Sequence, residues 1–158
     1  MSARTKYRKR ALDILFESEL QGLPVGGTLA TRIAANDPPV HDYTRRLVEG
    51  VAADAERIDT LISERAQGWT LERMPVVDRN LLRLATYEIV GIEDVPDEVA
   101  IAEAVNLARE LSTDESAGYL NGVLSAIAAS VRRSGGSEIG NREPDGPVSP
   151  VAGSEPPA

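Results

Sequence analysis

The sequence predicts an all-α, single-domain protein of about seven helices. Apolar residues recur at helical spacing through almost all of the first 133 residues. No stretch shows the alternation of β-branched and polar residues that is typical of a strand. The length of 158 residues suits one domain with its own hydrophobic core.

Four helices are predicted in the first half of the chain. Three have apolar stripes, formed by Leu12, Leu15, Phe16 and Leu20, by Tyr43, Leu47, Val48 and Val51, and by Ala55, Ile58, Leu61 and Ile62. A shorter helix is expected over residues 28–35, before Pro38 and Pro39. Gly22 and Pro24 should end the first helix, and Asp54 is a candidate N-cap of the fourth.

A turn and three helices follow. Residues 69–75 should fold as a compact turn, in which Trp69 either packs against Leu71 and Met74, the favoured interpretation, or contacts a partner. The three apolar stripes are Leu81, Leu82, Ala85 and Ile89, then Ile101, Ala104, Val105, Ala108 and Leu111, then Leu120, Val123, Leu124, Ile127 and Val131. Candidate starts of these helices are Asp78, Asp97 and Ser116, in that order.

Two polar residues need a structural explanation. Glu88 falls on the apolar face of its helix, and a buried carboxylate must be paired, so we expect an arginine or a helix terminus beside it. His41 is the only histidine. It is most simply interpreted as a residue at the start of the third helix.

The charge is distributed unevenly along the chain. The net charge is −8, yet residues 1–10 hold five basic and no acidic side chains. Residues 11–133, the predicted helical domain, are strongly acidic. Residues 134–158 contain five prolines, five glycines and four acidic residues, so we expect a disordered acidic tail. Binding of a polyanion is therefore expected at a basic N-terminal arm and not over the whole surface.

The basic arm and one tyrosine are the candidate binding residues. The arm, made of Arg4, Lys6, Arg8, Lys9 and Arg10, is either a solvated first turn or, as we favour, a contact for nucleic-acid phosphates. Tyr119 lies at the boundary of its apolar stripe, where a half-buried packing role and a stacking platform for an unpaired base both remain open. Gly122, in the same helix, suggests close helix packing.

Enzymatic and membrane functions have little support. The chain has no cysteine, and the Gly26-Gly27-Thr28 segment lacks the lysine of a phosphate-binding loop. No apolar run approaches the ~20 residues that span a bilayer, and the acidic residues after the arm do not suit a signal peptide. We expect no cofactor, no metal, no catalytic residue and a cytoplasmic location.

Four sequence blocks together resemble the NusB family of bacterial transcription antitermination factors, in its actinobacterial form. The blocks are Arg8-Lys9-Arg10-Ala11-Leu12 with Leu15-Phe16, Val77-Asp78-Arg79 with Leu82-Arg83 and Tyr87-Glu88-Ile89, Val95-Pro96 with residues 100–105, and Ser116 with Tyr119-Leu120-Asn121-Gly122-Val123-Leu124. The resemblance covers roughly residues 7–132. It implies two packed helical bundles and no enzymatic activity.

The resemblance also implies partners and site residues. Members of the family bind boxA RNA of nascent ribosomal RNA together with the ribosomal protein NusE, within an RNA polymerase antitermination complex, and some are homodimers. The RNA-binding residues implied here are Arg4, Lys6, Arg8, Lys9, Arg10, Glu115 and Tyr119. Asp78 and Arg79 match a segment near the NusE-contacting surface. Phe16 stands where many relatives have tyrosine, so a hydroxyl hydrogen bond is lost there.

Two other functions compete with antitermination. The same fold serves as an RNA-binding module of RNA cytosine methyltransferases, but those enzymes need a Rossmann-like domain with a nucleophilic cysteine. A helical protein-interaction scaffold with an incidental basic arm is the third possibility.

Overall fold

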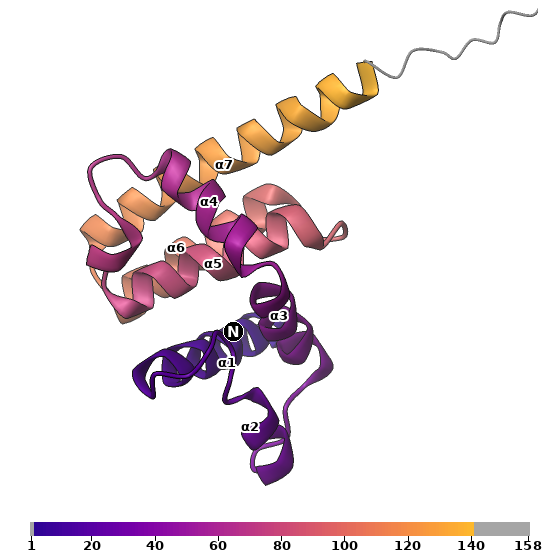
Figure 1. Ribbon diagram of the computed structural model, residues 1–158, viewed down its shortest axis with the longest axis vertical. Coiled ribbons are helices and arrows are strands. Elements are labelled where there is room, and N and C mark those ends of the chain that lie inside the picture. The colour runs from indigo at the N-terminus through magenta and orange to yellow at the C-terminus, as the bar shows by residue number, and fades with distance from the viewer. Residues whose placement is uncertain (1, 141–158) are drawn as a thin grey trace, which may run out of the picture. The chain divides into compact units, whose positions relative to one another are not determined.

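The computed structural model describes residues 2–140, and over that range the chain is all-helical (Figure 1). The elements are α1 (Ala3–Leu20), α2 (Leu29–Ala35), α3 (Asp42–Ala53), α4 (Ala55–Arg65), a short 3₁₀ helix η1 (Leu71–Arg73), α5 (Val76–Gly91), α6 (Asp97–Leu111) and α7 (Asp114–Gly140). The chain divides into two units, one ending at Ala128 and one beginning at Ala129. All packing described below lies within the first unit.

The helix α5 is the centre of the first unit, because it contacts α1, α3, α4 and α6. Figure 1 shows α1, α2 and α3 in one group, and α4, α5, α6 and the first turns of α7 in another. The predicted all-α class is confirmed over the described residues, and this arrangement agrees with the two bundles that the family resemblance implies.

Two helices, α5 and α7, begin before the residues predicted to cap them. Asp78 lies inside the first turn of α5, which begins at Val76 and has no side-chain cap. The helix α7 begins before Ser116, and the Thr113 hydroxyl accepts a hydrogen bond from the Ser116 backbone N–H at 2.9 Å. Both predicted caps were wrong for the same reason: their side chains hydrogen-bond each other across the core.

The core follows the predicted stripes except at the ends of α6 and α1, where Leu111 and Leu20 are exposed. Leu12 and Leu15 are buried, but Leu20 is 63% exposed. The inward position in the last turns belongs to Ser18, whose hydroxyl lies 2.9 Å from that of Thr28. This hydrogen bond allows the polar Ser18 side chain to be buried. Ser18 and not Leu20 therefore occupies the buried face at the end of α1.

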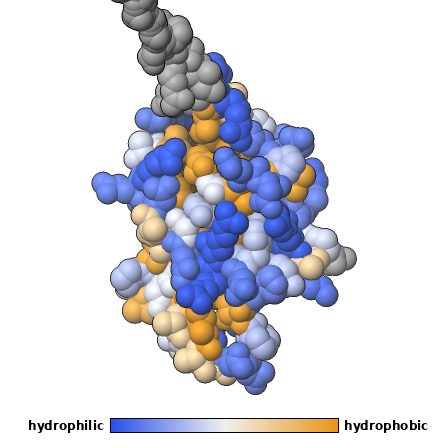
Figure 2. Space-filling model, turned by 90° about the vertical axis from the view of Figure 1, so that its right-hand side faces the viewer, coloured by the Kyte–Doolittle hydropathy of each residue, from blue (hydrophilic) through white to orange (hydrophobic). Residues whose placement is uncertain are grey.

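Large apolar side chains are also exposed beyond α1. Leu23, in the loop before α2, and Ile33, within α2, are 43% and 38% exposed. Figure 2 shows a face that is mostly hydrophilic, with one group of apolar residues in its upper half and another at its lower end, toward which Figure 1 places α2.

The last helix is longer than predicted. The sequence placed the end of the folded body at Arg133, whereas α7 continues to Gly140. A helix that has already formed extends at little cost, because each added residue gains one hydrogen bond. Residues 141–158, most of the predicted disordered tail, lie outside the described residues, so that expectation stays a prediction.

Close packing of α3 on α5 depends on Gly50. A Cβ atom at this position would lie 2.0 Å from Cζ of Tyr87. We expect Gly50→Ala to lower the free energy of unfolding by about 1–3 kcal/mol, because the tyrosine ring must move out of a packed interface. Chemical denaturation measures the loss.

Glycines of α7 provide the matched control for this substitution. A Cβ atom at Gly118 or Gly122 would meet nothing within 4 Å, so the close-packing interpretation of Gly122 was wrong. Gly118→Ala should therefore stabilise the protein, by up to about 1 kcal/mol of helix propensity. Equal destabilisation by Gly50→Ala and Gly118→Ala would contradict the packing argument.

Candidate nucleic-acid interface

The basic arm is helical and divides into two faces. Ser2 caps α1, its hydroxyl accepting from the Thr5 backbone N–H at 3.1 Å, so the arm forms the first turns of the helix. Residues three and four apart share a helix face. Lys6, Lys9 and Arg10 therefore lie on one side of α1, and Arg4 and Arg8 lie on another.

Arg8 is a buried structural residue. Its Nε donates to both carboxylate oxygens of Glu88, at 3.0 and 2.9 Å, and its Nη1 donates to Glu103 at 2.7 Å. Arg8 is only 5% exposed and Glu88 only 2%. The expectation that Glu88 is paired with an arginine is confirmed. The guanidinium of Arg8 is bound by these carboxylates, so it does not face solvent with the rest of the arm.

Tyr43 completes the buried cluster around Glu88. Its hydroxyl donates to the Glu88 carboxylate, and burial together with this hydrogen bond raises the pKa of Tyr43. Burial alone would lower the pKa of Arg8, but the hydrogen bond and negative charge of Glu88 raise it above its ordinary value. The cluster consequently holds Arg8 charged and Tyr43 neutral at physiological pH.

The remaining cations of the arm lie at the surface. Lys6 is exposed, Lys9 has an ion pair with Glu110 at 3.4 Å, and Arg10 donates to the Pro38 carbonyl oxygen at 3.5 Å. Arg4 reaches Asp94 at 3.3 Å and lies over the Tyr43 ring, 4.4 Å from its centroid. Exposed pairs of this kind are worth at most about 1 kcal/mol, so a phosphate can compete for these side chains.

Tyr119 lies beside Trp69, for which the sequence favoured a packing role in its turn over a partner contact. The two rings meet edge to face, with centroids 5.2 Å apart. Both are partly exposed, and they line one pocket together with Glu115. Partial burial raises the pKa of Tyr119, whose hydroxyl donates to the Gln67 carbonyl oxygen at 3.3 Å. Fifty residues separate the two aromatic residues, and no local pattern links them.

Asp78, predicted as a partner-binding residue, is fully buried. Its Oδ2 accepts from the Ser116 hydroxyl at 2.6 Å, which ties the first turn of α5 to that of α7. Its other carboxylate oxygen is buried without a hydrogen-bond partner in the structure. Direct contact between this side chain and a partner is therefore incompatible with the structure.

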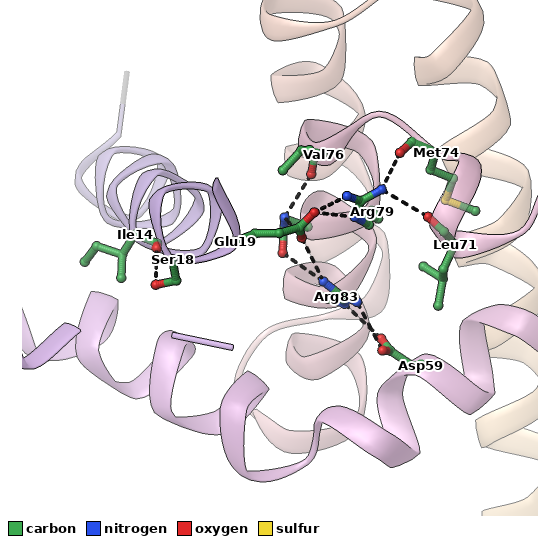
Figure 3. A network of polar contacts seen from close by, with 10 residues as sticks. Ile14, Ser18, Glu19, Asp59, Leu71, Met74, Val76, Arg79 and Arg83 are labelled. Atoms are coloured by element: carbon green, nitrogen blue, oxygen red, sulfur yellow. Dashed lines mark hydrogen bonds and ion pairs between the residues drawn. The ribbon is translucent and has the colours of Figure 1, made fainter. Parts of the chain in front are cut away.

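Arg79, the other predicted partner-binding residue, belongs to a polar network between α1, α4 and α5. Figure 3 shows its guanidinium between Glu19 and the backbone of η1 and the loop after it. Its Nε donates to Glu19 at 2.7 Å and its Nη1 donates to the Leu71 carbonyl oxygen at 3.2 Å. Arg83 forms ion pairs with two carboxylates, Glu19 at 3.4 Å and Asp59 at 2.9 Å. These four residues line an open groove between α1, α4, η1 and α5.

The network makes a testable prediction about pH. Burial favours a higher pKa for Glu19, but hydrogen bonds from Arg79 and Asn80 and the nearby arginine charges hold it below the ordinary 4.5. A carboxyl group with a lowered pKa stabilises the fold above pH 4.5, and that stabilisation is lost as the pH falls through the folded-state pKa. We expect the melting temperature of the wild type to drop more steeply below pH 4.5 than that of Glu19→Gln. Parallel curves would refute the role of this carboxylate.

Within the described part of the chain, no helix is long and apolar enough to cross a membrane. The same residues contain no group of three or more histidine or acidic side chains suited to a metal ion.

His41 is the N-cap of α3, and its Nδ1 accepts from the Tyr43 backbone N–H at 3.0 Å. Its predicted place at the start of the third helix is confirmed.

Comparison with known proteins places the chain among relatives of one kind. A family model described as the NusB family matches residues 5–129. The chain is 57% identical over 129 residues to the transcription antitermination protein NusB of Acidothermus cellulolyticus, covering 82% of this chain and 89% of that protein. It is 53% identical over 131 residues to the same protein of Salinispora tropica, covering 81% and 96%.

Solved structures agree with the sequence relatives. T. maritima NusB superposes with a TM-score of 0.72 at 35% identity, over 81% of this chain and 92% of that one. A chain from a crystal structure of the antitermination factors NusB and NusE in complex with dsRNA superposes with a TM-score of 0.69 at 25% identity, over 80% and 96%. Since the family model matches most of the chain and the fold agrees, the protein belongs to the NusB family.

Proposed function

We propose that this protein is a non-catalytic transcription antitermination factor that binds boxA RNA of nascent ribosomal RNA together with NusE. The complex joins RNA polymerase in the cytoplasm. Membership of the NusB family supports this function, and a related chain forms a complex with NusE and double-stranded RNA. The observation that carries the proposal is the side of α1 that holds Lys6, Lys9 and Arg10, here called the outward basic face, on an otherwise acidic protein.

The RNA surface combines this basic face with the pocket at Tyr119. Lys6, Lys9 and Arg10 of this face, together with the exposed Arg4, supply phosphate contacts, which are sequence-tolerant and salt-dependent. Tyr119 and Glu115 contact bases. Arg8 is not one of the RNA-binding residues, because its guanidinium is buried against Glu88. Its role is to fix α1 in place.

The NusE-contacting surface is the groove that contains Arg79. Leu15, Leu23 and Leu71 give the groove apolar walls, between the polar groups of Glu19 and Arg79. A mixture of apolar and charged groups is common in protein interfaces. Asp78 is buried and joins α5 to α7 through its hydrogen bond with Ser116, so it has no direct contact in this interface. A homodimer remains a further prediction for this chain.

The competing functions are less well supported. The relatives carry the name of the antitermination protein, and the matched part of this chain covers 89% and 96% of the first two of them. A module of a larger methyltransferase would match only part of its relatives. A pure protein scaffold leaves the surface cations of α1 without a role.

A titration with RNA and NusE tests the proposal. Fluorescein-labelled single-stranded boxA RNA is titrated with the full chain, alone and with saturating NusE, and anisotropy is recorded. We expect specific binding that NusE strengthens and that excess unlabelled boxA RNA competes away. Absence of binding in both titrations would refute the proposed function.

Substitution of Tyr119 separates the stacking and packing roles that the sequence left open. Tyr119→Phe should bind boxA RNA almost as well as the wild type, because the π-face remains. Tyr119→Ala should lose about 1–3 kcal/mol of binding. Partial exposure implies a smaller loss of folding stability than the ~3–5 kcal/mol of a buried aromatic. Normal binding with strong destabilisation in Tyr119→Ala would assign the residue to packing alone.

A further inference from the structure

Trp69 and Tyr119 form the walls of a corner on the surface of the first unit. The planes of their rings are 81° apart, so a flat molecule stacked on one ring would present its edge to the other. Both rings are partly exposed. Aromatic faces that are open to solvent are the usual platform for unpaired bases.

The corner is held in a fixed geometry from both sides. Gly68 has a φ of +78°, a left-handed conformation that suits glycine and sets the direction of the loop before Trp69. The Tyr119 hydroxyl joins this loop to α7 through the Gln67 carbonyl oxygen. Three residues before Tyr119 in α7, the hydroxyl of the buried Ser116 donates a hydrogen bond to Asp78. A site held in this way loses little entropy when a ligand binds.

The polar groups around the corner favour the edge of a base over a phosphate. Gln67, Thr113 and Glu115 line the pocket with the two rings, and this lining contains no lysine or arginine. A carboxylate repels phosphate but accepts hydrogen bonds from the exocyclic amino group of a base. A base that carries such a group is therefore favoured over uracil.

The outward basic face of α1 approaches the chain segment that leads to this corner. Lys9 pairs with Glu110, near the end of α6, and the pocket residues Thr113 and Glu115 follow within five positions. Phosphates bound at Lys9 could thus belong to the same RNA strand as a base in the corner.

We propose that Trp69 is a base-contacting residue, which together with Tyr119 receives one unpaired base of the bound RNA. This inference rests on the proposed function, because it assigns a further contact in the same RNA surface. Trp69 then determines affinity, and Glu115 favours a base with an exocyclic amino group.

Trp69 is the only tryptophan, so its fluorescence reports directly on the corner. Unlabelled single-stranded boxA RNA is titrated into the full chain while tryptophan emission is recorded. We expect saturable quenching with the same midpoint as the anisotropy of labelled RNA. Binding by anisotropy with unchanged emission would overturn the inference and leave the proposed function intact. No binding by either readout would overturn both.

Two substitutions of Trp69 provide a matched pair. Trp69→Phe keeps an aromatic face and should bind boxA RNA within about threefold of the wild type. Trp69→Leu keeps apolar bulk without a π-face and should bind on the order of 10-fold more weakly. Circular dichroism melts establish that both variants are folded to the same extent. Equal affinities of the two variants would overturn the inference.

Two further measurements identify what the corner recognises. Replacing Glu115 with Gln should reduce the preference for short C-only over U-only RNA, because the amide can also donate a hydrogen bond. A guanidinium group of a protein partner is the other chemistry that aromatic rings and a carboxylate accommodate. If Trp69→Leu weakens NusE binding and leaves RNA binding unchanged, the corner is a protein contact and the inference is wrong.

Discussion

Replacing Arg8 with Ala is expected to lower the free energy of unfolding by about 3–5 kcal/mol. The substitution leaves Glu88 buried without its cation, which is the costly way to break a buried ion pair. It also removes the bond to Glu103 that joins α1 to α6. Urea denaturation of the wild type and the variant measures the difference.

Two controls make this result specific. Lys9→Ala removes a cation from the neighbouring position, where the ion pair is exposed, and should cost no more than about 1 kcal/mol. Adding Glu88→Gln to Arg8→Ala should recover part of the lost stability, because no unpaired charge then stays buried. An Arg8→Ala variant as stable as Lys9→Ala would show that the cluster does not stabilise the fold.

The cluster also changes an expectation about RNA binding. The sequence alone suggests that Arg8, Lys9 and Arg10 can be replaced together without unfolding the protein. The buried position of Arg8 makes that triple substitution a test of folding as much as of binding. Loss of RNA binding in it would not identify the cations that contact phosphates.

The helices were predictable because their periodicity is strong. Apolar residues three and four apart define a buried face whatever it packs against, so the order and approximate extent of the described helices followed from local sequence. Leu20 was misplaced because Ser18 meets Thr28, a contact between segments that the α1 pattern does not contain. Asp78 and Ser116 were misplaced for the same physical reason.

The candidate site was only partly predictable. The sequence identified the five cations of α1 as a group, but the burial of Arg8 depends on its pairing with Glu88, eighty residues away. A local signal did exist: Arg8 lies three and four residues before Ala11 and Leu12, on the buried stripe of the helix. No equivalent signal linked Trp69 to Tyr119, because that contact exists only in the folded chain.

Replacing Lys6, Lys9 and Arg10 together with Ala is expected to weaken boxA RNA binding on the order of 100-fold at 0.1 M salt. For single-stranded RNA, removing one phosphate contact makes the salt dependence of binding shallower by about 0.7, so the slope should fall by about 2. Anisotropy titrations over a range of salt concentrations give both quantities. Stability should change little, because these side chains have weak or no contacts in the structure.

A charge-matched variant separates direct contact from a general change in charge. Arg45, Arg46 and Arg57 are exposed outside the arm, and replacing them with Ala removes the same three charges. Exposed charges farther apart than about 8 Å are largely screened in physiological salt, so this variant should retain most of its affinity and its salt slope. An equal loss of affinity in the two triple variants would show that net charge, and not the outward face of α1, determines RNA binding. A loss confined to the Lys6, Lys9 and Arg10 variant, with both proteins folded, would assign the phosphate contacts to that face.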